Sequence, residues 1–277
     1  MTETPKPPQG QLPPGGKPPQ GKAGQGTPAA AQPIAVTDDT LLDGRVKLRQ
    51  PREGYRVAID PVLLAAAVPA QAGEMVLDVG TGVGAAALCL AWRVPGARVV
   101  GLELQRVLGQ LASRNIDANG FDDRASVVIG DLQRPPPRLA PTSFTHVMAN
   151  PPYMEAGRAD PAPHPGKATA TVEGEADLAA WVRFCLLMAK QHGTVTFIHR
   201  ADRLDQLLAL LTGKVGDIAI LPFWPGADKP AGRVIVQARR DSNAPLRLLP
   251  GMLLHRPDGG YTAQADAILR GGNPIVL

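Results

Sequence analysis

The chain has 277 residues, enough for one large domain or two small ones, and 44% of them are hydrophobic, as in a folded globular protein. Two cysteines without a Cys-x-x-Cys or Cys/His cluster argue against a metal site, and no apolar run reaches the roughly 18 residues of a membrane helix. The net charge of +4 suits a polyanionic partner without requiring one. The first residues lack the apolar stretch of a secretory signal, so we expect a cytoplasmic protein.

Residues 1–36 differ from the rest of the chain in being rich in proline and glycine, and the sequence KPPQG occurs in them twice. Such a segment cannot bury enough apolar surface to offset the entropy of ordering it. We predict a disordered tail over 1–36 and a folded domain over 37–277. Within that domain, 37–72 is expected to form a hairpin and a helix, and 73–277 the core.

A short hairpin is predicted over 40–56, with Asp43-Gly44 as its turn. A helix is expected to follow over 58–68, with Asp60 as its N-cap and Pro61 as its first helical residue. The hairpin carries basic side chains that suit contacts with nucleic acid phosphates, although a solvated charged face explains them equally well. These candidates are Arg45, Lys47, Arg49 and Arg56.

Strands and helices then alternate along the chain. Short apolar strands are predicted over 74–80, 97–104, 125–132, 144–150 and 193–200, with helices over 84–94, 105–120, 175–190 and 201–214. Strands over 232–240 and 246–262 and a last helix over 263–271 complete the pattern. It predicts a Rossmann-like α/β fold: a seven-stranded, mostly parallel sheet with an antiparallel edge strand and helices on both faces.

A glycine-rich loop lies between the first of these strands and its helix. Its spacing is Gly-x-Gly-x-Gly, and an acid, Asp78, lies two residues before the first glycine. Glycines there let the backbone approach a ligand at the positive end of a helix, while an acid ending the next strand, Glu103, can accept both hydroxyls of a ribose. The carboxylate of Asp78 favours a ligand with an amino group and a sulfonium over a pyrophosphate. The expected cofactor-binding residues here are Asp78, Gly80, Thr81, Gly82, Gly84, Glu103 and Leu104.

The third strand ends in Gly-Asp-Leu, which adds two residues to the same edge of the sheet. Asp131 can accept a hydrogen bond from the amino group of an adenine, and Leu132 can pack on its face. For Asp131 alone, a turn residue or a helix cap is the competing interpretation.

These motifs resemble those of the class I S-adenosylmethionine-dependent methyltransferases, and the resemblance runs from about Asp43 to Leu277. Asp78–Gly84, Gly101–Leu104 and Gly130–Leu132 resemble that family's glycine loop, ribose acid and adenine acid. Asn-Pro-Pro-Tyr at 150–153 resembles the motif of its amino-methylating branch. Within that branch the chain is most similar to the bacterial enzymes that methylate N6 of an anticodon-loop adenine in valine tRNA. The resemblance implies S-adenosylmethionine as cofactor.

The resemblance also implies a catalytic task for Asn150–Tyr153. An exocyclic amine is a poor nucleophile because its lone pair is delocalised, so it must be turned toward the methyl carbon. The Asn150 side-chain oxygen, which also borders the cofactor, and the Pro151 carbonyl can hold its two hydrogens. Pro152 restricts the backbone, and Tyr153 offers a face for stacking a base. Without the glycine loop, a strand-ending turn would be the simpler interpretation.

The acceptor is the main alternative left open. Release-factor methyltransferases share this motif and methylate a glutamine amide, and adenines of rRNA or DNA are further candidates. The short segment ahead of the glycine loop favours a nucleic acid, and an unpaired loop base is accessible without base flipping. We therefore expect tRNA as the substrate of a monomeric enzyme without metal, with Lys167 and Arg200 as further contacts. A noncatalytic RNA-binding module on the same fold is the rival of another class.

Overall fold

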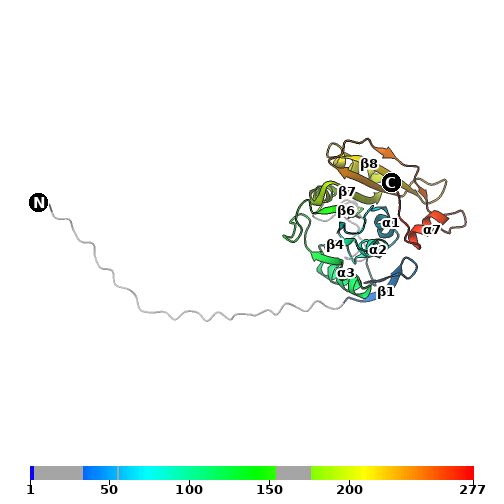
Figure 1. The fold of residues 1–277 in the computed structure, drawn as a ribbon, viewed down its shortest axis with the longest axis horizontal. Helices are drawn as coiled ribbons and strands as arrows, with labels where there is room; N and C mark the ends of the chain where they lie inside the picture. The colour runs from blue at the N-terminus through cyan, green and yellow to red at the C-terminus, as the bar shows by residue number, and fades with distance from the viewer. Residues whose placement is uncertain (3–33, 55, 154–175) are drawn as a thin grey trace. The chain divides into compact units, whose positions relative to one another are not determined.

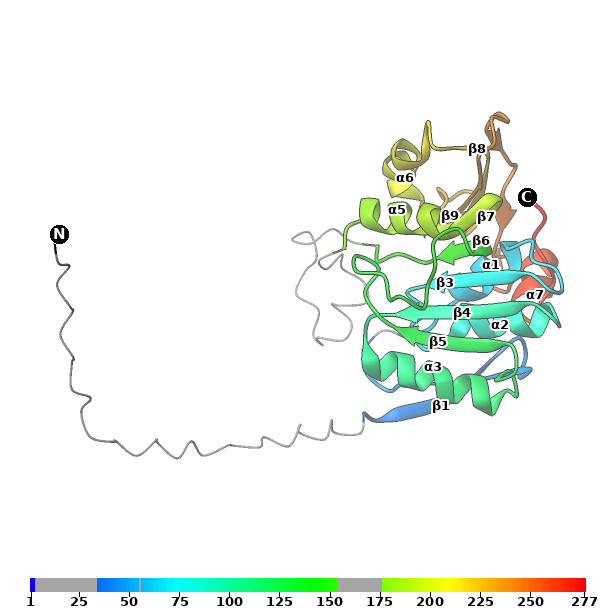
Figure 2. The same ribbon diagram turned by 60° about the vertical axis from the view of Figure 1, so that its left-hand side comes forward.

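A mixed β-sheet organises residues 34–277, with helices on both of its faces (Figures 1 and 2). The structure, a computed structural model, describes residues 1–2, 34–54, 56–153 and 176–277. The predicted tail therefore falls almost wholly outside the described residues, as do Lys167 and the rest of 154–175. Strand β1 begins at Val36, one residue before the predicted start of the domain.

Within the described ranges the sheet has nine strands, in the order β10-β8-β9-β7-β6-β3-β4-β5 with β11 also paired to β8. Their bounds are β3 Met75–Val79, β4 Arg98–Glu103, β5 Ala125–Ile129, β6 Phe144–Ala149, β7 Ala189–Arg200, β8 Val215–Trp224, β9 Arg233–Arg240, β10 Arg247–Leu248 and β11 Met252–Leu253. All are parallel to one another except β9, which is antiparallel to both of its neighbours.

The prediction of a mostly parallel α/β sheet is confirmed, but the described sheet has nine strands instead of the predicted seven, and its antiparallel strand was wrongly placed at an edge. Strand β9 lies inside the sheet, between β7 and β8. Its residues Val234, Ile235 and Val236 are all buried, as expected for a strand covered on both faces. Strand β8 was not predicted, and Pro222 within it is an unusual residue for a strand. Of the strand predicted over 246–262, only the two-residue strands β10 and β11 form.

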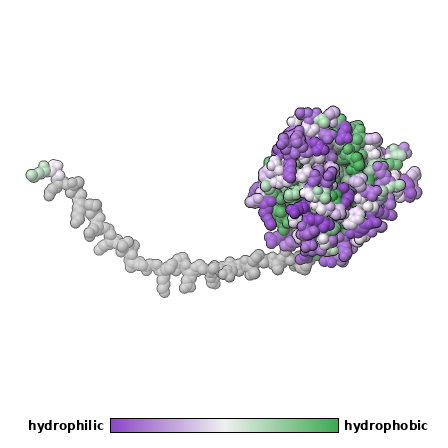
Figure 3. Space-filling view, viewed as in Figure 1, coloured by the Kyte–Doolittle hydropathy of each residue, from purple (hydrophilic) through white to green (hydrophobic). Residues whose placement is uncertain are grey.

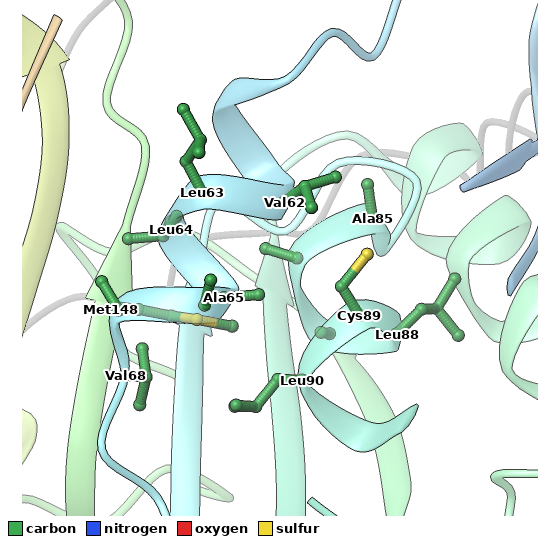
Figure 4. Close-up of a cluster of buried hydrophobic side chains, with 14 of the residues drawn as sticks. Val62, Leu63, Leu64, Ala65, Val68, Ala85, Leu88, Cys89, Leu90 and Met148 are labelled. Carbon is green, nitrogen blue, oxygen red and sulfur yellow. The ribbon is translucent and has the colours of Figure 1, made fainter. Parts of the chain in front are cut away.

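Side chains of alternating strand residues enter two separate cores, one on each face of the sheet. On one face, α1 (Asp60–Ala67), α2 (Ala85–Arg93), α3 (Arg106–Ala118) and α7 (Ala263–Leu269) cover Val76, Met148 and Ile235. Figure 4 shows this packing, with Ala65 of α1 lying toward α2, and with Leu64 of α1 and Met148 of β6 close to each other. On the other face, α5 (Leu178–Met188) and α6 (Leu204–Leu211), which follows the 3-10 turn η1 (Ala201–Arg203), cover Leu77, Val147 and Val236.

The predicted hairpin is confirmed as strands β1 (Val36–Leu41) and β2 (Val46–Pro51), with Asp43 and Gly44 in its turn. The hairpin attaches to α3 through asparagine side chains. Asn119 bonds both backbone groups of Lys47, while Asn115 bonds both backbone groups of Arg49. The Asn115 amide also donates to the Val83 carbonyl, so the hairpin is tied to the glycine loop.

On the face of the molecule in Figure 3, hydrophilic side chains cover most of the surface and hydrophobic ones gather in small patches. No helix among the described residues combines the length and the apolar character that crossing a membrane requires.

Candidate active site

The glycine loop leaves the end of β3 and turns directly into α2. Gly80, Gly82 and Gly84 have φ values of +70°, +59° and +88°, a region that disfavours any side chain. Gly80 is restricted further, because a Cβ atom there would lie 2.3 Å from the Trp181 ring of α5. The Gly80 and Thr81 amides donate to the Leu102 carbonyl, which fixes the loop to β4. The sequence therefore builds a rigid turn that only glycine permits.

Asp78, the last residue but one of β3, is a buried carboxyl beneath this loop, 3% exposed. Its Oδ2 accepts a hydrogen bond of 2.6 Å from the Thr81 hydroxyl. Burial raises the pKa of Asp78 from 3.8 to about 7, because the charged form is poorly solvated there. A cationic group placed beside the carboxyl would favour its ionised form. The site is thus suited to a ligand with an ammonium or sulfonium group.

Glu103 ends β4 next to the loop and is 6% exposed. One carboxylate oxygen accepts from the Gly82 amide at 2.9 Å, and the other accepts from the Gln105 amide at 2.7 Å. Burial raises the pKa of Glu103. Each carboxylate oxygen can accept a second hydrogen bond, so the fixed carboxylate can still bind two hydroxyls of a ribose.

Large apolar side chains are unusually exposed beyond Glu103: Leu104 by 64%, Ile129 by 42% and Val107 by 38%. They provide apolar surface at the edge where a flat ring was predicted to bind. Leu132 is partly buried against the second core. Asp131 accepts from the Gln133 amide at 2.8 Å and forms an ion pair of 3.4 Å with Arg134. Asp131 therefore serves as a turn residue in this structure, and its contact with an adenine stays a prediction.

Asn150 follows β6 directly, and β6 pairs with β3, so that Ala149 lies opposite Val79. The glycine loop and the Asn150–Tyr153 segment thus leave neighbouring strand ends at the same edge of the sheet. The Tyr153 hydroxyl lies 2.7 Å from Asn150 Oδ1. Pro151 is buried and Pro152 partly buried. The structure brings the predicted cofactor and catalytic segments together.

Asp60 was predicted to cap α1, and that prediction is wrong. The N-cap position is Ile59, and no side chain caps this helix. The Asp60 carboxyl, 5% exposed, instead lies 2.5 Å from the Tyr153 hydroxyl and forms an ion pair of 3.0 Å with Arg233 of β9. Pro61 lies in the first turn, but as the second helical residue rather than the predicted first, because the helix already begins at Asp60.

Further side chains surround Tyr153, and one of them, Arg233, was not predicted from the sequence. The Arg233 guanidinium lies over the Tyr153 ring, 4.6 Å from its centroid, and His199 meets the ring edge-on with centroids 5.6 Å apart. Arg203 donates to the Tyr153 carbonyl at 3.3 Å. His199 is fully buried, and burial lowers its pKa to about 4, so it is neutral at pH 7. His199 and Arg203 flank Arg200 in the sequence, at a strand end that was expected to border the site, whereas nothing near Arg233 in the sequence pointed to Tyr153.

The predicted RNA-contacting residues do not form one group. Arg45 donates to the Arg270 carbonyl and lies over Trp92 in the last turn of α2, and the Lys47 backbone bonds to Asn119 at the end of α3. Arg49 and Arg56 are ion-paired with Asp38 and Asp39. Among the candidates that the structure describes, Arg200 ends β7 opposite Arg233 at the Tyr153 edge, and it pairs with Asp202. In the described part of the chain, no group of three or more His, Cys, Asp or Glu side chains could hold a metal ion.

Comparisons with known proteins match the chain to methyltransferases. Residues 57–162 match the family model of the methyltransferase small domain. The chain is 27% identical over 216 residues to the tRNA1(Val) (adenine(37)-N6)-methyltransferase of Aeromonas hydrophila, covering 76% of this chain and 87% of that one. It is 35% identical over 107 residues to the enzyme of the same name from Shewanella loihica, covering 38% and 44% of the two chains.

Among solved structures, a predicted O-methyltransferase from Agrobacterium tumefaciens superposes with a TM-score of 0.65 at 22% identity, over 78% of this chain and 98% of that chain. This likeness shows the fold alone. The family match and the similarly named enzymes are what point to a methyltransferase.

Proposed function

We propose that this methyltransferase transfers the methyl group of S-adenosylmethionine to N6 of an adenine in the anticodon loop of a tRNA. The observation that carries the proposal is the pairing of Val79 with Ala149, because it places the glycine loop beside Asn150. A cofactor site and a site for an amine acceptor are thereby adjacent. The similar enzymes are named for adenine 37 of tRNA1(Val), which supports that nucleotide as the target.

The residues of the cofactor side fit S-adenosylmethionine, which supplies an electrophilic methyl group when bound. The buried Asp78 carboxylate would pair with its cationic part, and the glycine loop would let the cofactor approach the backbone closely. Glu103, already fixed by the Gly82 and Gln105 amides, would bind the ribose hydroxyls. The exposed Leu104 and Ile129 would flank the adenine ring, with Asp131 and Leu132 beyond them.

On the acceptor side, Asn150 Oδ1 and the Pro151 carbonyl would accept the two hydrogens of the N6 amino group. Held in this way, the amine directs its lone pair at the methyl carbon, and the positive charge that develops on nitrogen is partly neutralised. One face of the Tyr153 ring is covered by the Arg233 guanidinium, so a base would stack on the opposite face. Water can take the proton after transfer, because the methylated nitrogen is then acidic.

An RNA acceptor agrees with the net charge of +4 and with Arg200 at the Tyr153 edge. We further propose that the enzyme acts as a monomer in the cytoplasm, and that residues 1–36 form a tail outside the catalytic domain.

The test is an acceptor assay with the purified full chain and methyl-labelled S-adenosylmethionine. We expect label in a tRNA1(Val) transcript, recovered as N6-methyladenosine by mass spectrometry, and none in a matched transcript with guanosine at position 37. Label that appears only in added release factors would overturn the RNA proposal and assign a glutamine amide as acceptor.

A further inference from the structure

The hydrogen bonds of Tyr153 reveal a conflict between two acceptors. Its hydroxyl oxygen lies 2.5 Å from Asp60 Oδ2 and 2.7 Å from Asn150 Oδ1. A tyrosine hydroxyl has a single hydrogen, which only one of these acceptors can receive at full strength. The distinction matters because the proposed function needs Asn150 Oδ1 as an acceptor for the target amine.

Asp60 is the stronger of the two acceptors. An ionised carboxylate accepts shorter and roughly twice as strong hydrogen bonds as a neutral amide, and 2.5 Å lies within the range of such a bond. Arg233 Nε donates to the same oxygen at 3.0 Å and places a positive charge beside it. The Asp60 side chain is only 7% exposed, so water competes little for it. It also leaves its own helix uncapped, the usual task of an acid at the start of a helix.

We propose that Asp60 and Arg233 are positioning residues that draw the Tyr153 hydroxyl hydrogen away from Asn150. The Asn150 carbonyl oxygen is thereby kept available for the target amino group. When the Tyr153 hydroxyl donates its hydrogen to Asp60, its oxygen can accept a hydrogen bond from the Asn150 side-chain amide nitrogen. This requires the Asn150 amide to rotate by about 180°, which points Oδ1 away from Tyr153. The inference rests on the proposed role of Asn150 in orienting an amine, and not on which molecule carries that amine.

A double-mutant cycle between Asp60→Asn and Tyr153→Phe tests this. Asp60→Asn removes the charge but keeps the shape, so the Tyr153 hydrogen becomes shared with Asn150 and competes with the substrate. We expect kcat to fall about tenfold when Tyr153 is present, the equivalent of one hydrogen bond. In the Tyr153→Phe background there is no hydroxyl hydrogen to redirect, and Asp60→Asn should change kcat less than about twofold.

The Michaelis constant for S-adenosylmethionine should stay unchanged throughout, because the hydrogen bonds that the substitutions alter join Asp60, Tyr153, Asn150 and Arg233 on the acceptor side. Equal fold losses of kcat in both backgrounds would overturn the inference, as would a loss of cofactor affinity that parallels kcat. The matched control is Asp266→Asn, which breaks an exposed ion pair with Arg270 and should leave kcat unchanged. If Asp60→Asn does not fold, Arg233→Gln replaces it in the cycle with the same expectation, and Arg233→Lys should restore part of the activity.

The cycle is measured on whichever acceptor the wild-type enzyme methylates. A protein acceptor would therefore overturn the RNA proposal and leave the cycle interpretable. If tRNA is methylated but Asp60→Asn lowers kcat by the same factor with and without the Tyr153 hydroxyl, only the role of Asp60 and Arg233 would be overturned.

Discussion

The cofactor side and the acceptor side of the site are built in different ways. The cofactor side uses short segments at the ends of β3, β4 and β5, so its residues follow one another along the chain. The acceptor side gathers Asp60, Asn150, Tyr153, His199 and Arg233 from four separate parts of the chain. Local motifs can place a nucleotide, but the orientation of an amine here depends on packing between distant elements. Substitutions on the two sides should therefore fail in different ways.

The largest effect is expected for Asn150→Ala on the acceptor side. Loss of one oriented hydrogen-bonding group in a transition state costs about 10²–10³ in kcat. The dissociation constant of S-adenosylmethionine, measured by calorimetry, should stay within about twofold of the wild type, because most cofactor contacts lie elsewhere. Asn243→Ala, an exposed asparagine before β10, is the control and should be unaffected. Equal loss of binding and turnover would make Asn150 a structural residue.

Gly80→Ala should break the cofactor side instead. The new methyl group would lie 2.3 Å from the Trp181 ring, and φ at this position is +70°. We expect cofactor affinity to fall at least about tenfold, with a free energy of unfolding lower by roughly 1–3 kcal/mol from overpacking.

Gly73→Ala separates these two causes. Gly73 has a similar φ of +85°, but a Cβ atom there meets nothing within 4 Å. Its stability loss should be limited to about 1–2 kcal/mol, and cofactor binding should be intact. Similar cofactor affinities for the two variants would show that the Trp181 contact does not shape the loop.

The pH dependence of cofactor binding should also distinguish the two sides. With the pKa of Asp78 at about 7, its carboxyl is mostly ionised at pH 8 and mostly neutral at pH 6. If the ionised form binds the cationic cofactor, the dissociation constant should rise about tenfold from pH 8 to pH 6. Tyr153→Phe should show the same profile, because it alters only the acceptor side. A flat profile in calorimetry would exclude Asp78 as the pairing group.

Asp78 should also reduce the stability of the cofactor-free enzyme. Its pKa is raised from 3.8 to about 7 on folding, so stability present below pH 3.8 is lost as the pH rises through 7. Asp78→Asn should therefore stabilise the cofactor-free protein at pH 8 by up to about 4 kcal/mol, and less as the pH falls toward 4. Thermal unfolding of both proteins at pH 8 and at pH 4 measures this gain in stability, and the absence of a gain at pH 8 would contradict the prediction.

The smallest effect is expected for Lys47→Ala, because the Lys47 backbone bonds to Asn119 at the end of α3 and not to a residue of the site. We expect less than a twofold change in the Michaelis constant for tRNA. Arg200→Ala at the Tyr153 edge should raise it by about fivefold, the equivalent of roughly 1 kcal/mol. If Lys47→Ala and Arg200→Ala raised the Michaelis constant for tRNA equally at several salt concentrations, RNA would also contact the hairpin.

Much of this protein was predictable from the sequence because the responsible interactions are local. A glycine loop between an apolar strand and a helix fixes its own turn, and Asp78 and Glu103 are placed by strands of five and six residues. The Asn150–Tyr153 segment was predictable for the same reason, since it follows a strand of the same sheet. Parallel strands then bring these ends to one edge whatever lies between them.

Other features were decided only by the tertiary structure. The place of β9 inside the sheet depends on pairing with β7 and β8, although the consecutive buried residues Val234–Val236 were a signal for it. Asp60 looked like a helix cap because local sequence offers it only its own helix. Arg233, 173 residues further along the chain, reaches it only through that sheet order. A side chain bonds to whichever partner the fold brings near, and for Asp60 that partner could not be read from its neighbours in sequence.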